Sequence, residues 1–312
     1  MERFKVQVLL STFNGEKYID EQMKSLLSQV DIELHIVIRD DGSTDGTMMK
    51  LKKYKEEYPN LICIYEKENI GVVGSFFDLI SRSSAGYDYY AFCDQDDVWN
   101  NNKLISGILL INQMQQGQPL MYCSTTQMVD EHLAPLSIWP SPPQHLLSPY
   151  NALIENVCVG CTMLINQEAM NLVKSNLPYN LKNVIMHDWW IYLVVSAFGE
   201  IVFDPEPSIL YRQHQSNALG GLSDGWISKW RKRSLRFLNG QNHYILSNQA
   251  KEFMSVYIHF MTNKQCDDID EILKTQQQSL FKRVAYTLKT PFYRQSTIDN
   301  IVFKMVYIAG KL

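Results

Sequence analysis

The sequence predicts an α/β protein with a mostly parallel sheet flanked by helices and a C-terminal helical extension. Over the first two thirds of the chain, short apolar runs that favour strands alternate with segments of helical period, without hairpin turns between them. Such alternation is typical of right-handed βαβ crossovers. One run, residues 89–93, is apolar throughout, as a central strand covered on both sides would be, and it ends in carboxylates. Polar loops are therefore expected at one edge of the sheet, where ligands bind in this fold class.

Each element has its own local signal. The first strand ends at an Asn-Gly turn, and in the next segment apolar residues recur at i, i+4, i+7 and i+8 from Ile19, which predicts a helix. Residues 135–149 are rich in proline and serine, which predicts a loop over the ligand site or a lid. The strands are expected at 5–12, 33–39, 61–65, 89–93, 120–123, 156–165, 200–203 and 208–213, and the helices at about 19–27, 48–58, 75–83, 103–115 and 187–199.

Composition and charge exclude several classes of protein. With 312 residues, of which 46% are hydrophobic and 20% charged, the chain resembles a soluble globular protein with one large domain or two unequal ones. The net charge of -4 argues against a general nucleic-acid-binding protein. No signal peptide is visible, and the longest apolar stretch, residues 189–198, is shorter than the roughly 20 residues that cross a bilayer. We expect a cytoplasmic protein, soluble or peripheral at the inner face of a membrane.

The six cysteines lie in apolar contexts and are expected to be reduced and buried. Cys158 and Cys161 have the spacing of half a zinc knuckle, but no second pair at suitable spacing completes it. A structural zinc site is therefore not expected.

The C-terminal region is basic and aromatic in two places. Residues 226–239 contain five lysines and arginines, two tryptophans and no acid, and residues 281–312 form a second basic, aromatic segment. A basic helix of this kind can lie on an anionic membrane surface. It can equally pack on the rest of the protein with its charges in solvent, and the sequence leaves both possibilities open.

Three carboxylates, Asp94, Asp96 and Asp97, follow the apolar run at 89–93. Like charges so close together repel, and a hard divalent cation carrying phosphate groups is a natural occupant of such a loop. The alternative is that Asp96 or Asp97 caps the helix that starts near Asn101.

Polar motifs follow the first, second and fourth predicted strands: STFNG at 11–15, DDGSTDGT at 40–47 and FCDQDDVW at 92–99. In order and spacing, these motifs resemble those of family-2 glycosyltransferases of the GT-A fold, which are inverting, metal-dependent enzymes that use nucleotide-diphosphate sugars. The segments HDWW at 187–190 and YRQHQSN at 211–217 are similar to the bacterial rhamnosyltransferase branch of that family. The resemblance implies a GT-A domain at 1–220, with a nucleotide-sugar half at 1–99 and an acceptor half at 100–220, and a helical region at 221–312.

The resemblance also implies a nucleotide site at the ends of adjacent strands. A ring face and a carboxylate there could hold a pyrimidine through its N3–H, and by resemblance Asp41 is favoured for that hydrogen bond. The alternative is that the aspartate pair caps helices. The implied nucleotide-binding residues are Thr12, Phe13, Asn14, Asp40, Asp41 and Asp94.

Catalytic roles are implied in the same way. Asp96 and His214 are the expected ligands of Mn²⁺ or Mg²⁺, which would stabilise the departing diphosphate as a Lewis acid. The resemblance also implies that Asp94 faces the ribose or the metal and that Asp97 assists. Asp188 is the expected base, and its alternative role is to cap the helix it begins. Trp189 and Trp190 could stack on acceptor sugars or lie in the core. Many relatives carry an acid where this chain has His187, which leaves the acceptor side uncertain.

The expected function is transfer of a sugar to a hydroxyl of a growing, lipid-linked bacterial surface polysaccharide. The branch resemblance suggests dTDP-L-rhamnose as donor, with a UDP-hexose as the alternative. Residues 94–98 also satisfy the D-x-D-x-[TV] pattern of aspartate-nucleophile phosphatases, but those enzymes carry the motif on the first strand. A sugar-nucleotide-binding scaffold without activity is a further alternative.

Overall fold

The computed structural model describes residues 3–214 and 243–312. The contacts divide the chain into two compact units, which we describe separately. The first comprises Met1–Pro142, Val157–Leu177 and Met186–Arg212, and the second Pro143–Asn156, Pro178–Ile185 and Gln213–Leu312. The domain boundary predicted at residue 220 and the basic stretch 226–239 fall outside the described residues.

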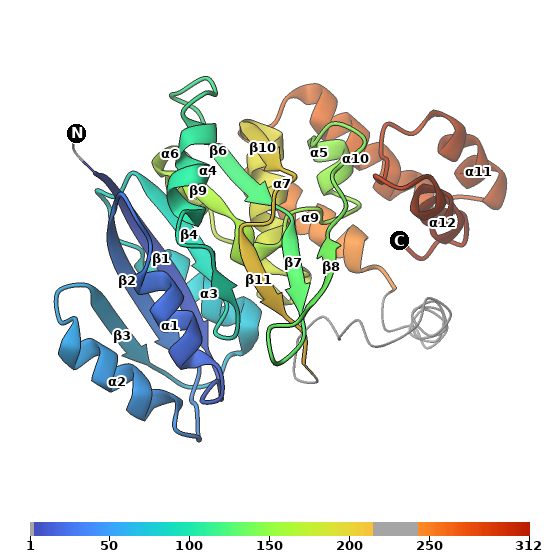
Figure 1. Ribbon diagram of the computed structural model, residues 1–312. Helices are drawn as coiled ribbons and strands as arrows, with labels where there is room; N and C mark the ends of the chain where they lie inside the picture. The colour runs from blue at the N-terminus through green and yellow to red at the C-terminus, as the bar shows by residue number, and fades with distance from the viewer. Residues whose placement is uncertain (1–2, 215–242) are drawn as a thin grey trace. The chain divides into compact units, whose positions relative to one another are not determined.

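The first unit is built on a seven-stranded, mostly parallel sheet (Figure 1). Its strand order is β10-β6-β9-β4-β1-β2-β3, and only β9 runs antiparallel to its neighbours, β4 and β6. The predicted fold class is therefore confirmed. The strands are β1 (Phe4–Thr12), β2 (Ile32–Asp40), β3 (Ile62–Glu66), β4 (Tyr89–Cys93), β6 (Leu120–Ser124), β9 (Leu164–Asn166) and β10 (Glu200–Asp204).

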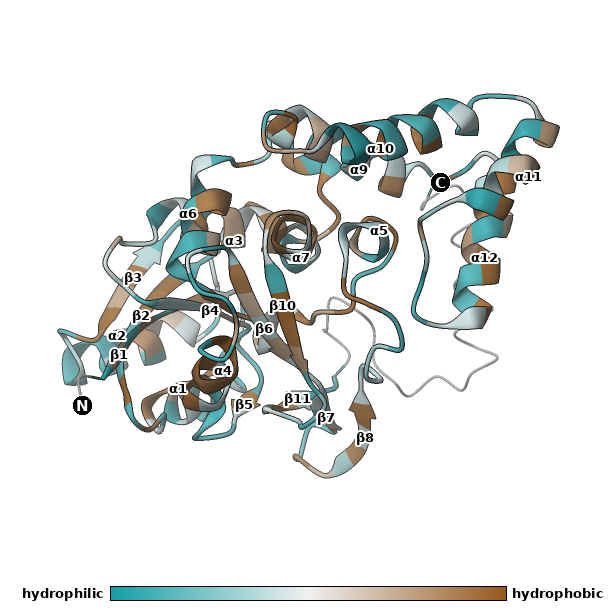
Figure 2. Cartoon of the chain, turned by 90° about the horizontal axis from the view of Figure 1, so that it is seen from above, coloured by the Kyte–Doolittle hydropathy of each residue, from teal (hydrophilic) through white to brown (hydrophobic). Residues whose placement is uncertain are grey.

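Helices cover both faces of this sheet (Figures 1 and 2). One face carries α1 (Ile19–Leu27), α2 (Thr47–Glu57) and α4 (Lys103–Ile111), and the other carries α3 (Gly71–Arg82), α6 (Gln167–Ser175) and α7 (His187–Phe198). In α1 the predicted apolar stripe is the buried one, because Ile19, Met23 and Leu26 all point into the core. The helices α4 and α7 are apolar on most of their surface, as the brown colour in Figure 2 shows.

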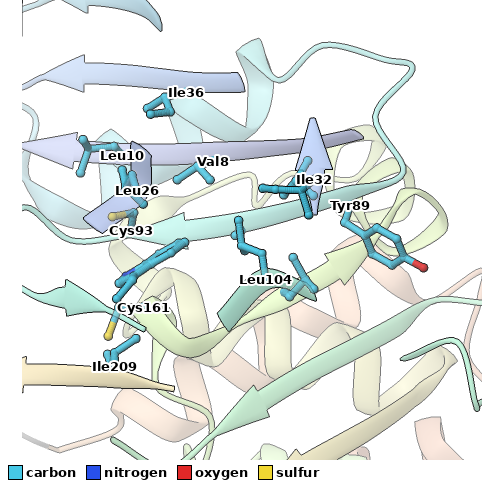
Figure 3. Packing of buried hydrophobic residues seen from close by; sticks show 14 of the residues in the cluster. Val8, Leu10, Leu26, Ile32, Ile36, Tyr89, Cys93, Leu104, Cys161 and Ile209 are labelled. Atoms are coloured by element: carbon cyan, nitrogen blue, oxygen red, sulfur yellow. The ribbon is translucent and has the colours of Figure 1, made fainter. Parts of the chain in front are cut away.

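The core lies between the sheet and the first set of helices (Figure 3). Val8 of β1 and Ile36 of β2 pack there against Leu26 of α1, and Leu104 of α4 fills the space below β4. All five residues of β4 are buried, as expected of a central strand. This packing fixes the carboxyl end of β4, where the acids begin.

A second, four-stranded sheet was not predicted. Its order is β5-β11-β7-β8, with β5 at Val98–Trp99, β11 at Ile209–Arg212, β7 at Thr126–Val129 and β8 at Pro135–Trp139. The prediction that 135–149 is only a loop is therefore wrong for β8, which pairs antiparallel with β7. Its five residues are all exposed, so no apolar and polar alternation marked it as a strand.

Two other expected elements differ from the structure. In place of one strand at 156–165, a 3₁₀ turn at Gly160–Thr162 precedes the short β9, because Thr162 N–H and its hydroxyl both bond to the Val159 carbonyl. The helix expected at 103–115 ends at Ile111.

The second unit is helical, as predicted. It contains α5 (Pro149–Ala152), a 3₁₀ turn at Leu181–Asn183, α9 (Ile245–Tyr257), α10 (Asn263–Gln276), α11 (Leu280–Lys289) and α12 (Thr297–Ile308). The rings of Tyr286 in α11 and Tyr307 in α12 lie 5.3 Å apart and fill the space between these helices. Within residues 3–214 and 243–312, we find no helix long and apolar enough to cross a membrane.

Candidate active site

The acids that follow β4 form a cluster at the carboxyl end of that strand. One carboxylate oxygen each from Asp94 and Asp97 and the sulfur of Cys161 lie within 4.8 Å of one another. Asp97 is buried, whereas Asp94 and Asp96 are partly exposed. Cys161 comes from the Gly160–Thr162 turn, so the cluster joins segments far apart in the sequence. Of the two acids in this group, neither is Asp96, the predicted ligand.

Negative charge is concentrated in this cluster. Burial, together with the nearby carboxylates of Asp96 and Asp188, raises the pKa of Asp94 to about 7. Burial raises the pKa of Asp97 as well, and the charges of Asp96 and Asp94 add to that effect. Each acid in the cluster therefore resists ionisation when no positive charge lies between them.

The donor atoms of the cluster fit a divalent cation. Carboxylate oxygens are the ligands that Mg²⁺ and Mn²⁺ prefer. Arg212 lies beside the loop, but its Nε donates to the backbone carbonyl of Asp96 (2.9 Å) and its terminal nitrogen pairs with the Glu21 carboxylate. The Arg212 side chain thus forms an ion pair with Glu21.

Asp188 approaches the cluster from α7. Its side chain is 6% exposed, and its two oxygens accept hydrogen bonds from the backbone N–H groups of Gly160 (3.1 Å) and Trp189 (2.6 Å). Its charge raises the pKa of Asp94, which places the two carboxylates within electrostatic reach of each other. Its role as the base remains a prediction.

The two tryptophans after Asp188 have different environments. Trp190 is completely buried in the core, so it cannot stack on an acceptor and that prediction is wrong. Trp189 is partly exposed, and its predicted contact with an acceptor remains a prediction.

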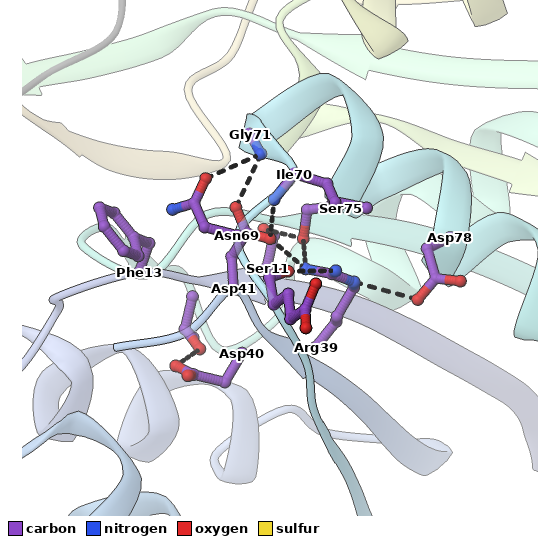
Figure 4. Close-up of polar contacts among 12 residues, drawn as sticks. Ser11, Phe13, Arg39, Asp40, Asp41, Asn69, Ile70, Gly71, Ser75 and Asp78 are labelled. Atoms are coloured by element: carbon purple, nitrogen blue, oxygen red, sulfur yellow. Dashed lines mark hydrogen bonds and ion pairs between the residues drawn. The ribbon is translucent and has the colours of Figure 1, made fainter. Parts of the chain in front are cut away.

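Five of the six predicted nucleotide-binding residues lie at the ends of β1 and β2, where Figure 4 labels Phe13, Asp40 and Asp41, and the sixth, Asp94, follows β4. The Asp40 carboxylate accepts hydrogen bonds from the Thr12 hydroxyl (2.8 Å) and from the Ser43 backbone and hydroxyl (2.8 and 2.6 Å). The Asn14 side-chain oxygen accepts one from the Thr44 backbone (2.8 Å). These bonds hold the two loops against each other. Asp40 thereby closes the turn after β2 and does not cap α2, whereas the alternative interpretation expected it to cap a helix.

Asp41 anchors the beginning of α3 (Figure 4). Its carboxylate accepts hydrogen bonds from the backbone N–H groups of Ile70 (2.8 Å) and Gly71 (2.9 Å), and it pairs with the buried guanidinium of Arg39. A carboxylate is favourable at this position because the N-terminus of a helix carries partial positive charge. Contact between Asp41 and a base remains a prediction.

Gln95 was not predicted as a site residue, yet it links the acid loop to the first strand. Its side chain exchanges two hydrogen bonds with the backbone of Phe13, at 2.8 and 2.9 Å. Gly15 leaves room for this contact, because a Cβ there would lie 2.2 Å from the Gln95 oxygen. The Phe13 ring is 45% exposed and is free to contact a ligand.

Arg212 and Lys103 are two buried cations next to the acids that sequence reasoning missed. Arg212 donates its backbone N–H to Asp97 (3.0 Å), and its side chain also bonds to the Glu131 carbonyl (2.5 Å). The Lys103 ammonium stands 3.6 Å above the Trp99 ring, and burial lowers its pKa to about 8. Only the run YRQH at 211–214 could have pointed to Arg212, and Lys103 stands in an apolar helix without a distinguishing motif.

His214, the second predicted metal ligand, belongs to the second unit. It is half-buried and comes two residues after the end of β11. Its role in binding a cation remains a prediction.

The chain is similar in sequence to known proteins. The sequence profile of Glycosyl transferase family 2 matches residues 7–172, which include the acids after β4. The dTDP-rhamnosyl transferase RfbG of Shigella flexneri is 30% identical over 226 residues, covering 68% of this chain and 73% of that protein. The putative teichuronic acid biosynthesis glycosyltransferase TuaG of Bacillus subtilis is 27% identical over 164 residues, covering 52% and 62%.

Solved structures support the fold. The structure of S. aureus TarS 1–349 in complex with UDP superposes with a TM-score of 0.57 at 17% sequence identity, covering 92% of this chain and 75% of that one. At this identity, the likeness concerns the arrangement of helices and strands.

Proposed function

Because this chain belongs to glycosyl transferase family 2, we propose that it transfers a sugar, with inversion, from a nucleotide-diphosphate donor to a hydroxyl of a saccharide. The main support is the position of Asp188, a carboxylate on a separate helix that lies within electrostatic reach of Asp94. Transfer with inversion needs one group that acts on the leaving diphosphate and another, on the opposite side of the sugar, that takes the proton of the incoming alcohol. Asp94 and Asp188 would lie on these two sides.

Asp188 acts as the base. Its oxygens are oriented by two backbone N–H groups, and the carboxylate accepts the proton of the acceptor hydroxyl as that oxygen attacks the sugar. Its burial removes competing water.

Asp94, Asp96 and Asp97 are the residues of the first unit that would hold Mn²⁺ or Mg²⁺, and a carboxylate oxygen of Asp94 lies within 4.8 Å of one of Asp97. His214 is a further proposed ligand, on the resemblance of its motif alone. A bound cation would offset the charge of the departing diphosphate. The protein's own contribution is to hold these oxygens in one loop, which Arg212 and Gln95 tie to the strands on either side.

The nucleotide binds at the ends of β1 and β2. The exposed Phe13 ring offers a stacking face for the base, and Asp41 offers a carboxylate for its N3–H. Thr12, Asn14 and Asp40 fix the loops that present these two groups.

The donor is dTDP-L-rhamnose, a proposal that rests on the similarity to RfbG, which is named a dTDP-rhamnosyl transferase. The acceptor is a growing bacterial surface polysaccharide on a lipid carrier, and TuaG, named for teichuronic acid biosynthesis, supports the polysaccharide part. UDP-hexoses are the alternative donors, and their rates of transfer should be compared with that of dTDP-L-rhamnose.

Substitution of Asp188 tests the chemistry. With Mn²⁺ and a panel of dTDP- and UDP-sugars, Asp188→Asn should lose transfer by about 10²–10⁴-fold, because the base is gone. It should keep donor and cation binding, measured by thermal shift. Glu200→Gln, an exposed acid at the start of β10, is the control. Transfer by Asp188→Asn at the wild-type rate would contradict the assignment.

Peripheral contact with the membrane, at the cytoplasmic face, is a further part of the proposal. On α11, Phe281 and Leu288 are 86% and 85% exposed, and Leu280 and Val284 lie on the same face. Residues 279–312 contain six lysines and arginines and one acid. An exposed apolar face in a basic segment suits an anionic lipid surface.

Vesicle binding tests this contact. Wild-type protein should co-sediment with vesicles that contain phosphatidylglycerol, and less with neutral vesicles. The double substitution Phe281→Glu and Leu288→Glu should abolish this binding and leave transfer to a water-soluble acceptor unchanged. Equal binding by the variant would show that α11 is not the contact.

A further inference from the structure

We propose that Trp139 and Tyr211 form a platform on which a sugar ring of the acceptor stacks. This inference rests on the proposed function, and it names the residues that bind the acceptor at the same site. The platform takes the role of acceptor contact that the sequence had suggested for Trp190, which is buried in the core.

The two rings come together through the second sheet. Tyr211 lies in β11, which pairs with β5 directly after the acids, and Trp139 is the last residue of β8. The strand β7 lies between β11 and β8, and the ring centroids are 6.2 Å apart with an interplanar angle of 27°. The offset stack presents one broad aromatic surface. Figure 1 shows these strands side by side.

The platform extends from the acid cluster to solvent. At its inner end, Tyr211 stands between Leu210, which pairs with Val98 of β5, and Arg212, whose backbone N–H donates to the Asp97 carboxylate (3.0 Å). At its outer end, Trp139 is 37% exposed. A group resting on the Trp139 ring is therefore about one ring away from the acids.

The chemistry of a saccharide suits this surface. A pyranose ring has a face of C–H groups, which an aromatic ring can cover with dispersion contacts while the hydroxyls stay in water. The partly exposed indole of Trp139 is a site of this kind, and binding there costs little entropy because the ring is already stacked on Tyr211.

The platform and the nucleotide site lie on opposite sides of the acid loop. Gln95 ties this loop to Phe13 at the end of β1, where the base is proposed to bind. Arg212 ties the same loop to β11 on the other side. A ligand on Trp139 is thus separated from the base by the acids, as an acceptor must be.

The test compares three variants. Trp139→Ala removes the outer ring, Trp139→Phe keeps an aromatic face, and Ile138→Ala is the control. Ile138 is 56% exposed on the same strand, and its side chain points to the other face of the sheet. Because both positions are exposed, the melting temperatures of all three should match the wild type.

Two readouts are measured. In the first, each protein with dTDP and Mn²⁺ is applied to an array of bacterial oligosaccharides that includes rhamnose-containing fragments. In the second, transfer kinetics are recorded for a saccharide that the array identifies. Trp139→Ala should lose array binding and raise the acceptor KM at least tenfold, with the donor KM unchanged. Trp139→Phe should keep most of the array binding and an acceptor KM close to that of the wild type. Ile138→Ala should behave as the wild type in both readouts.

The outcomes separate this inference from the proposed function. Equal array binding by Trp139→Ala and wild type, or binding by neither, overturns the platform. A rise in donor KM equal to the rise in acceptor KM also overturns it. Transfer by the wild type alongside any of these results leaves the glycosyltransferase proposal standing, whereas absence of transfer with every donor contradicts that proposal alone.

Discussion

His187 is a buried histidine next to the proposed base. Its ring stacks on Phe76 with centroids 3.7 Å apart, and it is 3% exposed. Burial lowers its pKa to about 3, so the ring is neutral in the folded protein. Gly160 allows this packing, because a Cβ there would lie 3.0 Å from the ring nitrogen. The ring therefore fills the space between Phe76 and Gly160 at the start of α7.

This burial predicts an acid-sensitive fold. The folded-state pKa is below the unfolded value of about 6.5, so the unfolded chain binds more protons between these values and stability falls as pH drops below 6.5. From pH 6.5 to pH 5 the wild type should lose about 2 kcal/mol more than His187→Phe, measured by urea unfolding. His132→Phe, at an exposed position, is the control. A His187→Phe profile parallel to the wild type would contradict the prediction.

The sequence predicts the positions of the acidic residues of the site better than it predicts the role of the buried Arg212. Asp94 and Asp97 follow an apolar strand, so their place at the sheet edge follows from local pattern alone. The role of Arg212 depends on the meeting of α1, the acid loop and the β7–β8 turn, which no local pattern encodes. His214 could be named by its motif, but its role depends on how the chain continues after β11.

At the scale of elements, Arg212 connects three of them. Its side chain is 1% exposed and bonds to the carbonyls of Asp96 and Glu131 and to the Glu21 carboxylate, with the guanidinium 4.5 Å from the Tyr18 ring. The planar fork of arginine makes several of these bonds at once, which a lysine ammonium cannot do. The acid loop is therefore held to the second sheet and to α1 by one residue.

We expect Arg212→Lys to destabilise the protein by about 2–4 kcal/mol, because it leaves buried acceptors unpaired. Arg82→Lys is the matched control, because Arg82 pairs with Asp78 on the exposed side of α3 and should lose about 0–1 kcal/mol. Both values come from urea unfolding without ligand. A loss for Arg212→Lys as small as that of the control would show that the loop is held by other contacts.

Elements with a strong period were predicted, and those defined by tertiary pairing were not. The helices α1 and α7 and the strand β4 have continuous apolar signals, and their positions match the prediction closely. The strand β9 has three residues and gains its place by pairing antiparallel between β4 and β6. The exposed β8 is likewise a strand because β7 lies beside it. Pairing of this kind depends on the whole fold.

At the scale of the whole molecule, the net charge of -4 is small, but carboxyl groups are concentrated at one place, the end of β4. Asp94, Asp96 and Asp97 follow β4, and Asp188 lies within electrostatic reach of Asp94. Burial, with the charges of neighbouring carboxylates, raises the pKa values of Asp94 and Asp97. A natural sequence keeps such repulsion only where it serves function. The cluster is therefore expected to lower the stability of the cation-free protein, as the proposed cation site implies.

The loss of folding stability in the cation-free protein can be measured by substituting Asp94. Its folded-state pKa of about 7 is above the unfolded value of 3.8, so the folded protein binds more protons between these values and stability falls as pH rises through that window. At pH 8 without cations, Asp94→Asn should be more stable than the wild type by about 2–4 kcal/mol, because the amide carries no charge. Added Mn²⁺ should raise the melting temperature of the wild type much more than that of Asp94→Asn.

The control for this experiment is Asp88→Asn, an acid at the other end of the same region, just before β4, where it accepts a hydrogen bond from the Lys5 backbone. It should leave the pH profile and the response to Mn²⁺ unchanged. If Asp94→Asn is no more stable at pH 8 and responds to Mn²⁺ like the wild type, the acids after β4 do not repel one another in the cation-free protein. The cation site would then have to be sought elsewhere in the chain.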